Sequence, residues 1–124
     1  MRVFKTKEFA RSARRETIRD ATLLEAASRA ERGLIDADLG GGLIKQRVAR
    51  PGQGRRSGYR TLMAFRAGGR TVFVYGFAKN ERDNIGPEEL EFWRKVAGAF
   101  VTMDDARLRT LLDEQEMVEV VGDG

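Results

Sequence analysis

The sequence predicts an α+β domain in which helices flank a group of strands. Three observations support this fold class. Apolar residues recur with helical spacing near both ends of the chain, and they alternate with polar residues in the middle. Two of the middle segments are joined through Gly68-Gly69, which is typical of a hairpin. The expected order is β-α-α-β-β-β-α-α-β, and no linker or repeat divides residues 1–124, so we expect a single domain.

The first third of the chain predicts one strand and two helices. Residues 1–5 alternate as a short strand does, and a helix follows over residues 6–15 with Phe9 and Ala13 on one face. Asp20 is the expected N-cap of a second helix. Its apolar positions keep the helical period as far as Leu34, and Gly33 is placed to end it.

The middle of the chain predicts three strands. From Leu43 onward, Ile44 and Val48 belong to one face of a strand, and Lys45 and Arg47 belong to the other. A loop rich in Gly and Arg spans residues 49–58, and strands over 59–66 and 71–77 follow. The last of these strands is apolar on both faces, which predicts a central position in the sheet.

The C-terminal third predicts two helices and a final strand. Gly86-Pro87 begins a helix, because proline suits the first helical position. Trp93 shares a helical stripe with other apolar residues of this segment, so we expect it in the core. Asp104 is a suitable cap for the next helix, and residues 117–121 have the character of a strand.

Composition limits the chemistry that the chain can perform. It contains no Cys and no His, which excludes disulfides, thiolate zinc sites, cysteine nucleophiles and Ser-His catalysis. We therefore expect no cofactor and no metal, and any reaction must use Lys, Arg, Tyr, Glu, Asp or Ser. No uncharged stretch of membrane-spanning length exists, and no apolar segment follows the basic start, so we expect a cytoplasmic protein.

Positive charge is concentrated in one segment. Residues 43–82 contain 10 basic residues and a single carboxylate, Glu81, whereas residues 83–124 contain 4 basic and 11 acidic residues. Of the 23 basic residues in the chain, 18 are Arg, whose planar guanidinium is well suited to bidentate phosphate contacts. A solvated basic surface is the ordinary explanation of such a run, but separation of the acids from it favours a partner rich in phosphates.

Several segments together carry a family resemblance: residues 33–45, Arg50-Pro-Gly-Gln-Gly, Ser57-Gly-Tyr-Arg-Thr, and residues 77–85 with the sequence Phe-Ala-Lys-Asn-Glu-Arg-Asp-Asn-Ile. They resemble the RelE-like toxins of bacterial type II toxin-antitoxin modules, in particular the HigB-type branch. The resemblance implies a small antiparallel sheet with N-terminal and C-terminal helices packed on it. It also implies cleavage of mRNA in the A site of translating ribosomes, and neutralisation by a helix-turn-helix antitoxin.

The resemblance also implies an active surface. Basic residues on the strand that enters the Gly-Tyr-Arg hairpin correspond to Lys45 and Arg47, and the hairpin arginine corresponds to Arg60. The basic cluster after the next strand corresponds to Lys79 and Arg82. An aromatic acid-base residue found in the best-known relatives has no counterpart, because Gly86 stands in its place.

These residue types suit RNA cleavage. RNA carries its own nucleophile, the 2′-hydroxyl, so cleavage needs in-line positioning, stabilisation of charge on the phosphate, and groups that accept and donate protons. Arginine is not a base, so we interpret Arg47, Arg60 and Arg82 as phosphate clamps. Lys45, Lys79 and Tyr59 are the acid-base candidates. Neighbouring strand residues point to opposite faces, so Arg60 is preferred to Tyr59.

The loop arginines extend this hypothesis to RNA binding. Arg50, Arg55 and Arg56 are candidates for contacts with the RNA backbone, although a solvated loop is an equally good interpretation of them. Phe77 is expected in the core. Two other functions stay open: a module that binds RNA or the ribosome without cleaving, and a toxin of the same superfamily that acts on DNA gyrase.

Overall fold

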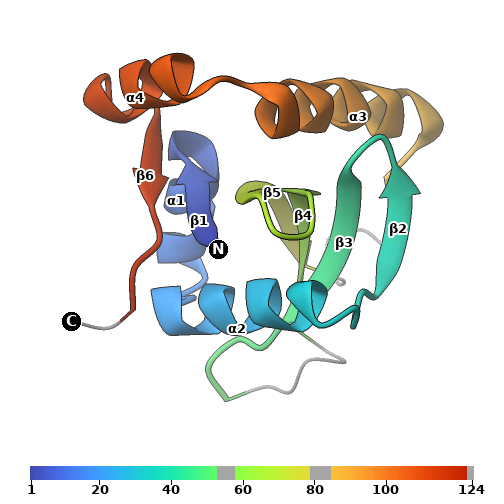
Figure 1. Cartoon of the computed structure of the whole chain (residues 1–124). Coiled ribbons are helices and arrows are strands. Elements are labelled where there is room, and N and C mark those ends of the chain that lie inside the picture. Colours follow the sequence, from blue (N-terminus) through green and yellow to red (C-terminus); the bar gives the residue numbers. More distant parts are fainter. Residues whose placement is uncertain (53–57, 79–84, 123–124) are drawn as a thin grey trace.

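The computed structural model describes residues 1–52, 58–78 and 85–122. Its elements along the chain are β1 (Arg2–Thr6), α1 (Lys7–Arg15), α2 (Asp20–Glu31), β2 (Ala37–Gly40), β3 (Leu43–Val48), β4 (Tyr59–Phe65), β5 (Arg70–Ala78), α3 (Pro87–Thr102), α4 (Asp105–Asp113) and β6 (Met117–Glu119). The α+β class is confirmed, and Figure 1 shows α3 and α4 on one side of the strands and α2 on the other.

The strands form one sheet in the order β2-β3-β4-β5-β1-β6. Neighbouring strands are antiparallel except β1 and β5, which run parallel with Arg2 opposite Arg70 and Phe4 opposite Val72. The sheet is therefore mixed, and this one pair departs from the antiparallel arrangement that the resemblance implies. Two helices and three strands separate β1 from β5 in the chain, and a connection of that length permits parallel pairing. The prediction that β5 is central is confirmed.

A hydrophobic core lies on each face of the sheet. The first is formed with α1 and α2 and includes Phe9, Leu23 and Phe73. The second is formed with α3 and α4 and includes Leu62 and Ala97. Each buried strand residue therefore belongs to one of two faces, which we call the α1/α2 face and the α3/α4 face.

Local signals place most helix ends where the sequence predicts them. Gly86 is the N-cap of α3 with Pro87 at the first position, and the Asp104 side chain accepts a hydrogen bond from the Arg107 N–H. Gly33 has φ +84° beyond the end of α2, as a left-handed C-terminal stop requires. The prediction for Asp20 is wrong: it lies inside α2, and its carboxylate instead pairs with Lys5 Nζ at 2.8 Å.

One strand, β2, is absent from the predicted order. It has four residues, Ala-Asp-Leu-Gly, none of them fully buried and none β-branched or aromatic, so its sequence resembles a loop. Gly40 at its end and the next two residues, Gly41 and Gly42, have φ between +65° and +87°, and this turn brings β3 back antiparallel to β2. Within the residues that the structure describes, no helix has the length and apolar character needed to cross a membrane.

Candidate active site

Three of the candidate basic residues share the α3/α4 face of the sheet. Arg60 alternates with Leu62 and Ala64, which belong to the core beneath α3 and α4. Lys45 and Arg47 alternate on β3 with Ile44 and Val48, which belong to the opposite core. We call Lys45, Arg47 and Arg60 the basic face. The structure thus brings together residues from two strands that the sequence analysis assigned to one surface.

Arg47 and Arg60 are direct partners in the pairing of β3 with β4. Residues paired in this way have their Cβ atoms about 4.5–5.5 Å apart, and two like charges at such positions oppose each other. Arg60 is only 7% exposed, and its Nη1 atom is buried with no hydrogen-bond partner among the residues that the structure describes. Among the described residues, no acidic group forms an ion pair with any member of the basic face.

This arrangement has the electrostatic character of an anion site. A buried, unpaired donor on a cation is unfavourable in the free protein, because the group has left water without gaining a partner. A phosphate oxygen between Arg47 and Arg60 would supply the missing acceptor and reduce the repulsion.

Two side chains outside β3 form hydrogen bonds with the backbone of Arg47. Asp36 Oδ2 accepts a hydrogen bond from the Arg47 N–H at 2.7 Å, and Arg29 Nη2 donates to the Arg47 carbonyl at 2.7 Å. Arg29 is 6% exposed and also pairs with Glu25 at 2.9 Å. The pairing of β2 with β3 does not reach Arg47, so these two side chains supply the hydrogen bonds that its backbone N–H and carbonyl would otherwise lack. Sequence reasoning missed Arg29 and Asp36, because no local pattern links them to Arg47.

Tyr59 lies on the other face of the sheet. It is 3% exposed and belongs to the core formed with α1 and α2. Its ring fills the space beside Gly76, where a Cβ atom would collide with Tyr59 Cε2. Because β4 alternates regularly from Tyr59 to Ala64, Tyr59 and Arg60 cannot address the same substrate. This buried position supports a packing role for Tyr59 and does not support its place among the acid-base candidates.

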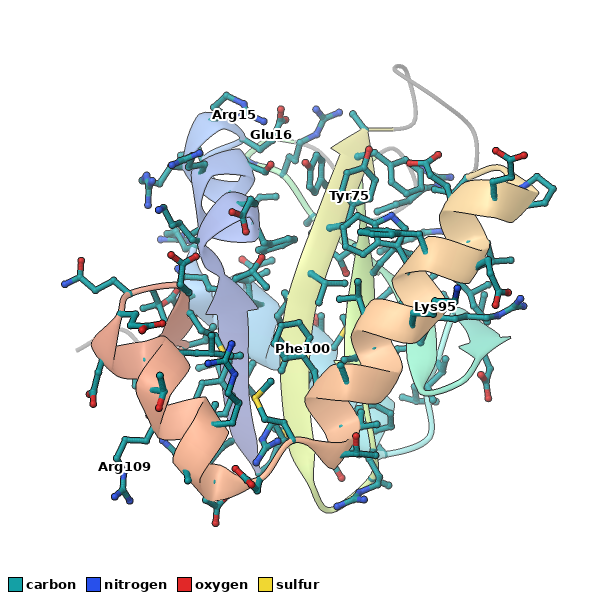
Figure 2. The ribbon with its side chains drawn as sticks, turned by 90° about the horizontal axis from the view of Figure 1, so that it is seen from above. Arg15, Glu16, Tyr75, Lys95, Phe100 and Arg109 are labelled. Atoms are coloured by element: carbon teal, nitrogen blue, oxygen red, sulfur yellow. The ribbon has the colours of Figure 1, made fainter. Side chains whose placement is uncertain are left out.

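A line of aromatic rings borders the basic face. Phe77 is opposite Arg60 in the pairing of β4 with β5, and its ring lies 5.9 Å from that of Tyr75. Tyr75 stacks on Trp93 of α3 at 5.0 Å, and Phe92 meets Trp93 edge-on at 4.9 Å. Phe77 is buried and Trp93 packs against the core, as predicted. Figure 2 shows Tyr75 beside the N-terminal half of α3.

The remaining candidates do not join this group within the described residues. Arg50 Nη1 pairs with Glu16 Oε1 at 2.9 Å, next to the turn between α1 and α2. Arg55, Arg56, Lys79 and Arg82 lie outside the described residues, although β5, which carries Phe77, ends at Ala78, directly before Lys79 in sequence.

A family model decides the relationship of this chain to known proteins. The model described as "RelE toxin of RelE / RelB toxin-antitoxin system" matches residues 1–120. The chain belongs to the RelE toxin family. No curated protein matches the sequence. As a RelE-family protein, the chain is a toxin of a toxin-antitoxin system, and the basic face is the part of this toxin that we consider for its chemistry.

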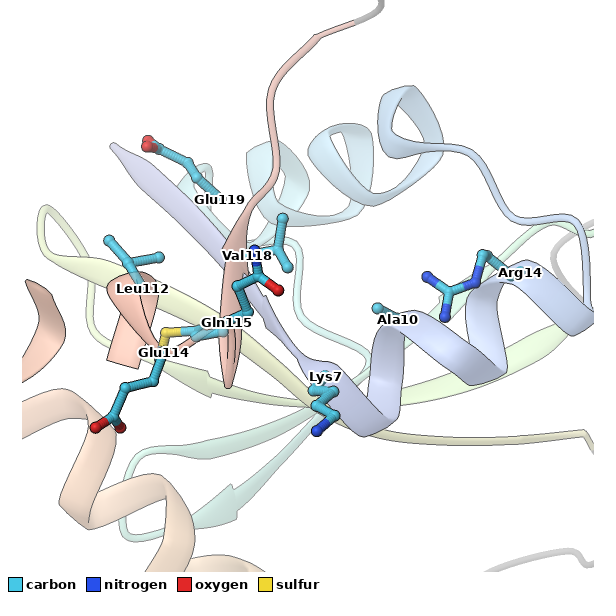
Figure 3. Close-up of a pocket in the computed structure, with 9 residues that line it drawn as sticks. Lys7, Ala10, Arg14, Leu112, Glu114, Gln115, Val118 and Glu119 are labelled. Atoms are coloured by element: carbon cyan, nitrogen blue, oxygen red, sulfur yellow. The ribbon is translucent and has the colours of Figure 1, made fainter. Parts of the chain in front are cut away.

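A concavity of the RelE-family toxin lies away from the basic face. It has a volume of about 510 Å³ and is enclosed by α1, β6 and the turn that joins α4 to β6 (Figure 3). Its lining includes Lys7, Arg14, Val118 and Glu119. Arg2 donates hydrogen bonds to Glu119 at 2.8 and 3.1 Å, and this contact lowers the pKa of the Glu119 carboxyl from its ordinary value. The same pair raises the pKa of Arg2.

Proposed function

We propose that this toxin is a ribosome-dependent endoribonuclease that cleaves mRNA in the A site without a metal or cofactor, and that it belongs to the HigB-type branch. The observation that carries the proposal is the pairing of Arg47 with Arg60, whose Nη1 atom is buried and has no hydrogen-bond partner in the described part of the chain. A scissile phosphate is the ligand that this geometry suits best, because its non-bridging oxygens accept hydrogen bonds from both guanidinium groups.

The reaction follows from the chemistry of RNA. The 2′-oxygen attacks the adjacent phosphorus and loses its proton to a base, while the 5′-oxygen leaves and gains a proton from an acid. The products carry a 2′,3′-cyclic phosphate at one end and a 5′-hydroxyl at the other, and addition of water to the cyclic phosphate opens it to a 3′-phosphate. Arg47 and Arg60 stabilise the negative charge that grows on the phosphate in the transition state. We assign Arg82 to the same task.

Lys45 and Lys79 are the proposed acid-base residues. With Tyr59 in the opposite core, Lys45 is the remaining acid-base candidate among the described residues. It occupies the position two residues before Arg47 on the same face of β3, so its amino group shares the surface on which the phosphate would bind.

The proposed partners are the ribosome and a helix-turn-helix antitoxin, which places the toxin in the cytoplasm. We assign Arg55 and Arg56 to the RNA backbone of the ribosome. Arg50 is less suited to this role, because its guanidinium is already paired with Glu16. The strong positive charge of residues 43–82 supports an RNA partner.

Expression of the toxin without its antitoxin tests the proposal. We expect growth and translation to stop, and primer extension to show new mRNA 5′ ends inside coding regions. Arrest with intact mRNA would favour the alternative of a module that binds without cleaving. Arrest with broken chromosomal DNA would favour action on gyrase. An Arg60→Ala variant expressed in parallel should show neither arrest nor new ends.

A further inference from the structure

We infer that Tyr75 is a nucleobase-stacking residue of the substrate site. This inference rests on the proposed function, because it places the base next to the phosphate that Arg47 and Arg60 would bind. It adds a residue and a contact that the sequence analysis did not assign.

A one-residue bulge in β5 brings Tyr75 to the substrate face. Leu62 pairs with Tyr75, whereas the next residue of β4, Met63, pairs with Phe73, so Val74 is the extra residue. Before the bulge, Val72 and Val74 face the core beneath α3 and α4. Regular alternation would send Tyr75 to the opposite face, yet it packs beneath α3 and stacks on Trp93. Bulges of this kind commonly redirect side chains next to active sites.

The opposite face of the sheet explains why the bulge is maintained. With the bulge in place, Gly76 faces the α1/α2 core and Tyr59 covers it. Regular alternation would place the Tyr75 ring in that core, which Tyr59 already fills. Tyr59 and Gly76 together therefore stabilise the arrangement that sends the rings of Tyr75 and Phe77 toward the basic face.

The position of Tyr75 suits a nucleotide held by Arg60. Arg60 pairs with Phe77, so Tyr75 is its diagonal neighbour on the same face. Diagonal neighbours in a sheet are about 7–8 Å apart, within reach of long and aromatic side chains. Tyr75 keeps part of its surface exposed while Trp93 supports its ring. An aromatic ring beside phosphate-binding cations is how proteins bind single-stranded RNA, and stacking accepts any base.

Packing of α3 against the sheet is the alternative explanation for Tyr75, and the chain offers a matched control for it. Phe100, a residue of α3 itself, is also half-buried and packs against the same core. Figure 2 shows it at the other end of the helix, away from Tyr75. A purely structural role predicts similar effects of removing either ring, whereas a substrate role predicts an effect on RNA binding at Tyr75 alone.

Binding of a non-cleavable RNA tests the inference. A short single-stranded RNA with 2′-O-methyl groups and a fluorescent label is titrated with wild-type toxin and with the variants Tyr75→Phe, Tyr75→Leu and Phe100→Leu. We expect Tyr75→Phe to bind as the wild type does, and Tyr75→Leu to bind about ten-fold more weakly or worse. Phe100→Leu should bind normally. Trp93 is the single tryptophan of the chain, so its emission should change when a base stacks on Tyr75.

A cross-link gives a test that needs no variant. A single-stranded RNA that carries 5-iodouridine is irradiated with the wild-type toxin, and the cross-linked residue is mapped by mass spectrometry. We expect the cross-link at Tyr75. A cross-link elsewhere with none at Tyr75, or a Tyr75→Leu variant with wild-type affinity, would overturn the inference.

One further result tests the stacking role itself, and a second separates this inference from the proposed function. If Tyr75→Phe loses as much RNA affinity as Tyr75→Leu, the hydroxyl is what matters and the stacking role is wrong. If the wild-type toxin binds RNA through Tyr75 but does not cleave mRNA on ribosomes, the endoribonuclease proposal fails while the base-stacking contact stands.

Discussion

Arg47 and Arg60 face one another across β3 and β4, and within residues 1–52, 58–78 and 85–122 the buried Nη1 atom of Arg60 has no hydrogen-bond partner. The free toxin therefore contains a repulsive pair of cations at a place where the two surrounding cores are well packed. Such an arrangement is unfavourable for folding and favourable for binding an anion. Stability and activity should thus respond in opposite directions when this charge is removed.

Replacing Arg60 should abolish cleavage without unfolding the toxin. We expect Arg60→Met and Arg60→Ala to lower the single-turnover rate on programmed ribosomes about 100-fold or more, because one stabiliser of the phosphate charge is lost. Arg60→Met should keep or raise the melting temperature, since the buried cation and its repulsion with Arg47 are removed. Both variants should still bind the antitoxin.

Arg66 provides the control for charge alone. It is an exposed arginine in the turn of the same hairpin, so Arg66→Ala changes the net charge equally. That variant should cleave at nearly the wild-type rate. A loss of activity in Arg66→Ala equal to that in Arg60→Ala would show that overall charge, and not the position of Arg60, controls cleavage.

Lys45 should control the pH dependence of cleavage if it transfers a proton. We expect Lys45→Ala to reduce the single-turnover rate about 100-fold or more, in the range usual for a general acid or base. Lys45→Arg keeps the positive charge but not the ability to titrate, so it should flatten one limb of the pH-rate profile. Full rescue by arginine would show that Lys45 supplies charge only, and the same comparison at Lys79 would then identify the proton carrier.

Arg55 and Arg56 should contribute to ribosome binding and not to chemistry. The double alanine variant should bind ribosomes more weakly, and the slope of affinity against salt should fall by about one for each lost phosphate contact. Cleavage at saturating toxin should persist. A double variant that binds normally but fails to cleave would contradict this division between the loop and the basic face.

The Arg2–Glu119 pair should make a small contribution to stability that depends on pH. The folded toxin holds the pKa of Glu119 below its ordinary value. Its contribution is therefore present above that ordinary value and is lost as the pH falls through the lowered one. Both side chains are well exposed, so Glu119→Gln should lower stability at neutral pH by about 0.2–1 kcal/mol. Thermal melts should show a smaller difference near pH 3 or in high salt.

The sequence contains enough local information for most elements of the fold. The hairpin between β4 and β5 follows from Gly68, which has φ +74°, and the start of α3 follows from Pro87. The pairing of β1 with β5 and the short strand β2 depend on contacts between distant segments. No local pattern predicts such contacts, which is why the parallel pair and the extra strand were missed.

The candidate site was predictable to the extent that it follows strand alternation. Alternation correctly placed Lys45 and Arg47 on one face of β3 and separated Arg60 from Tyr59. The side chains that hold the Arg47 backbone, Arg29 and Asp36, come from α2 and the segment after it, so only the tertiary structure identifies them. The sequence does not reveal the position of Tyr75. Apolar residues occupy both faces of β5, so the change of face at the bulge leaves no change in the apolar pattern.

The extra residue at Val74 reverses which positions of β5 point to each face of the sheet. Up to Val74, even-numbered residues contribute to the layer with α3 and α4, and after it odd-numbered residues do. A single-residue deletion there would exchange the two faces for every later position of the strand, so that Tyr75 and Phe77 would point to the α1/α2 face and Gly76 and Ala78 to the α3/α4 face. The spacing between Val72 and Phe77 is therefore as much a determinant of this toxin as the identity of the residues, and homologues are best compared by counting residues across this stretch.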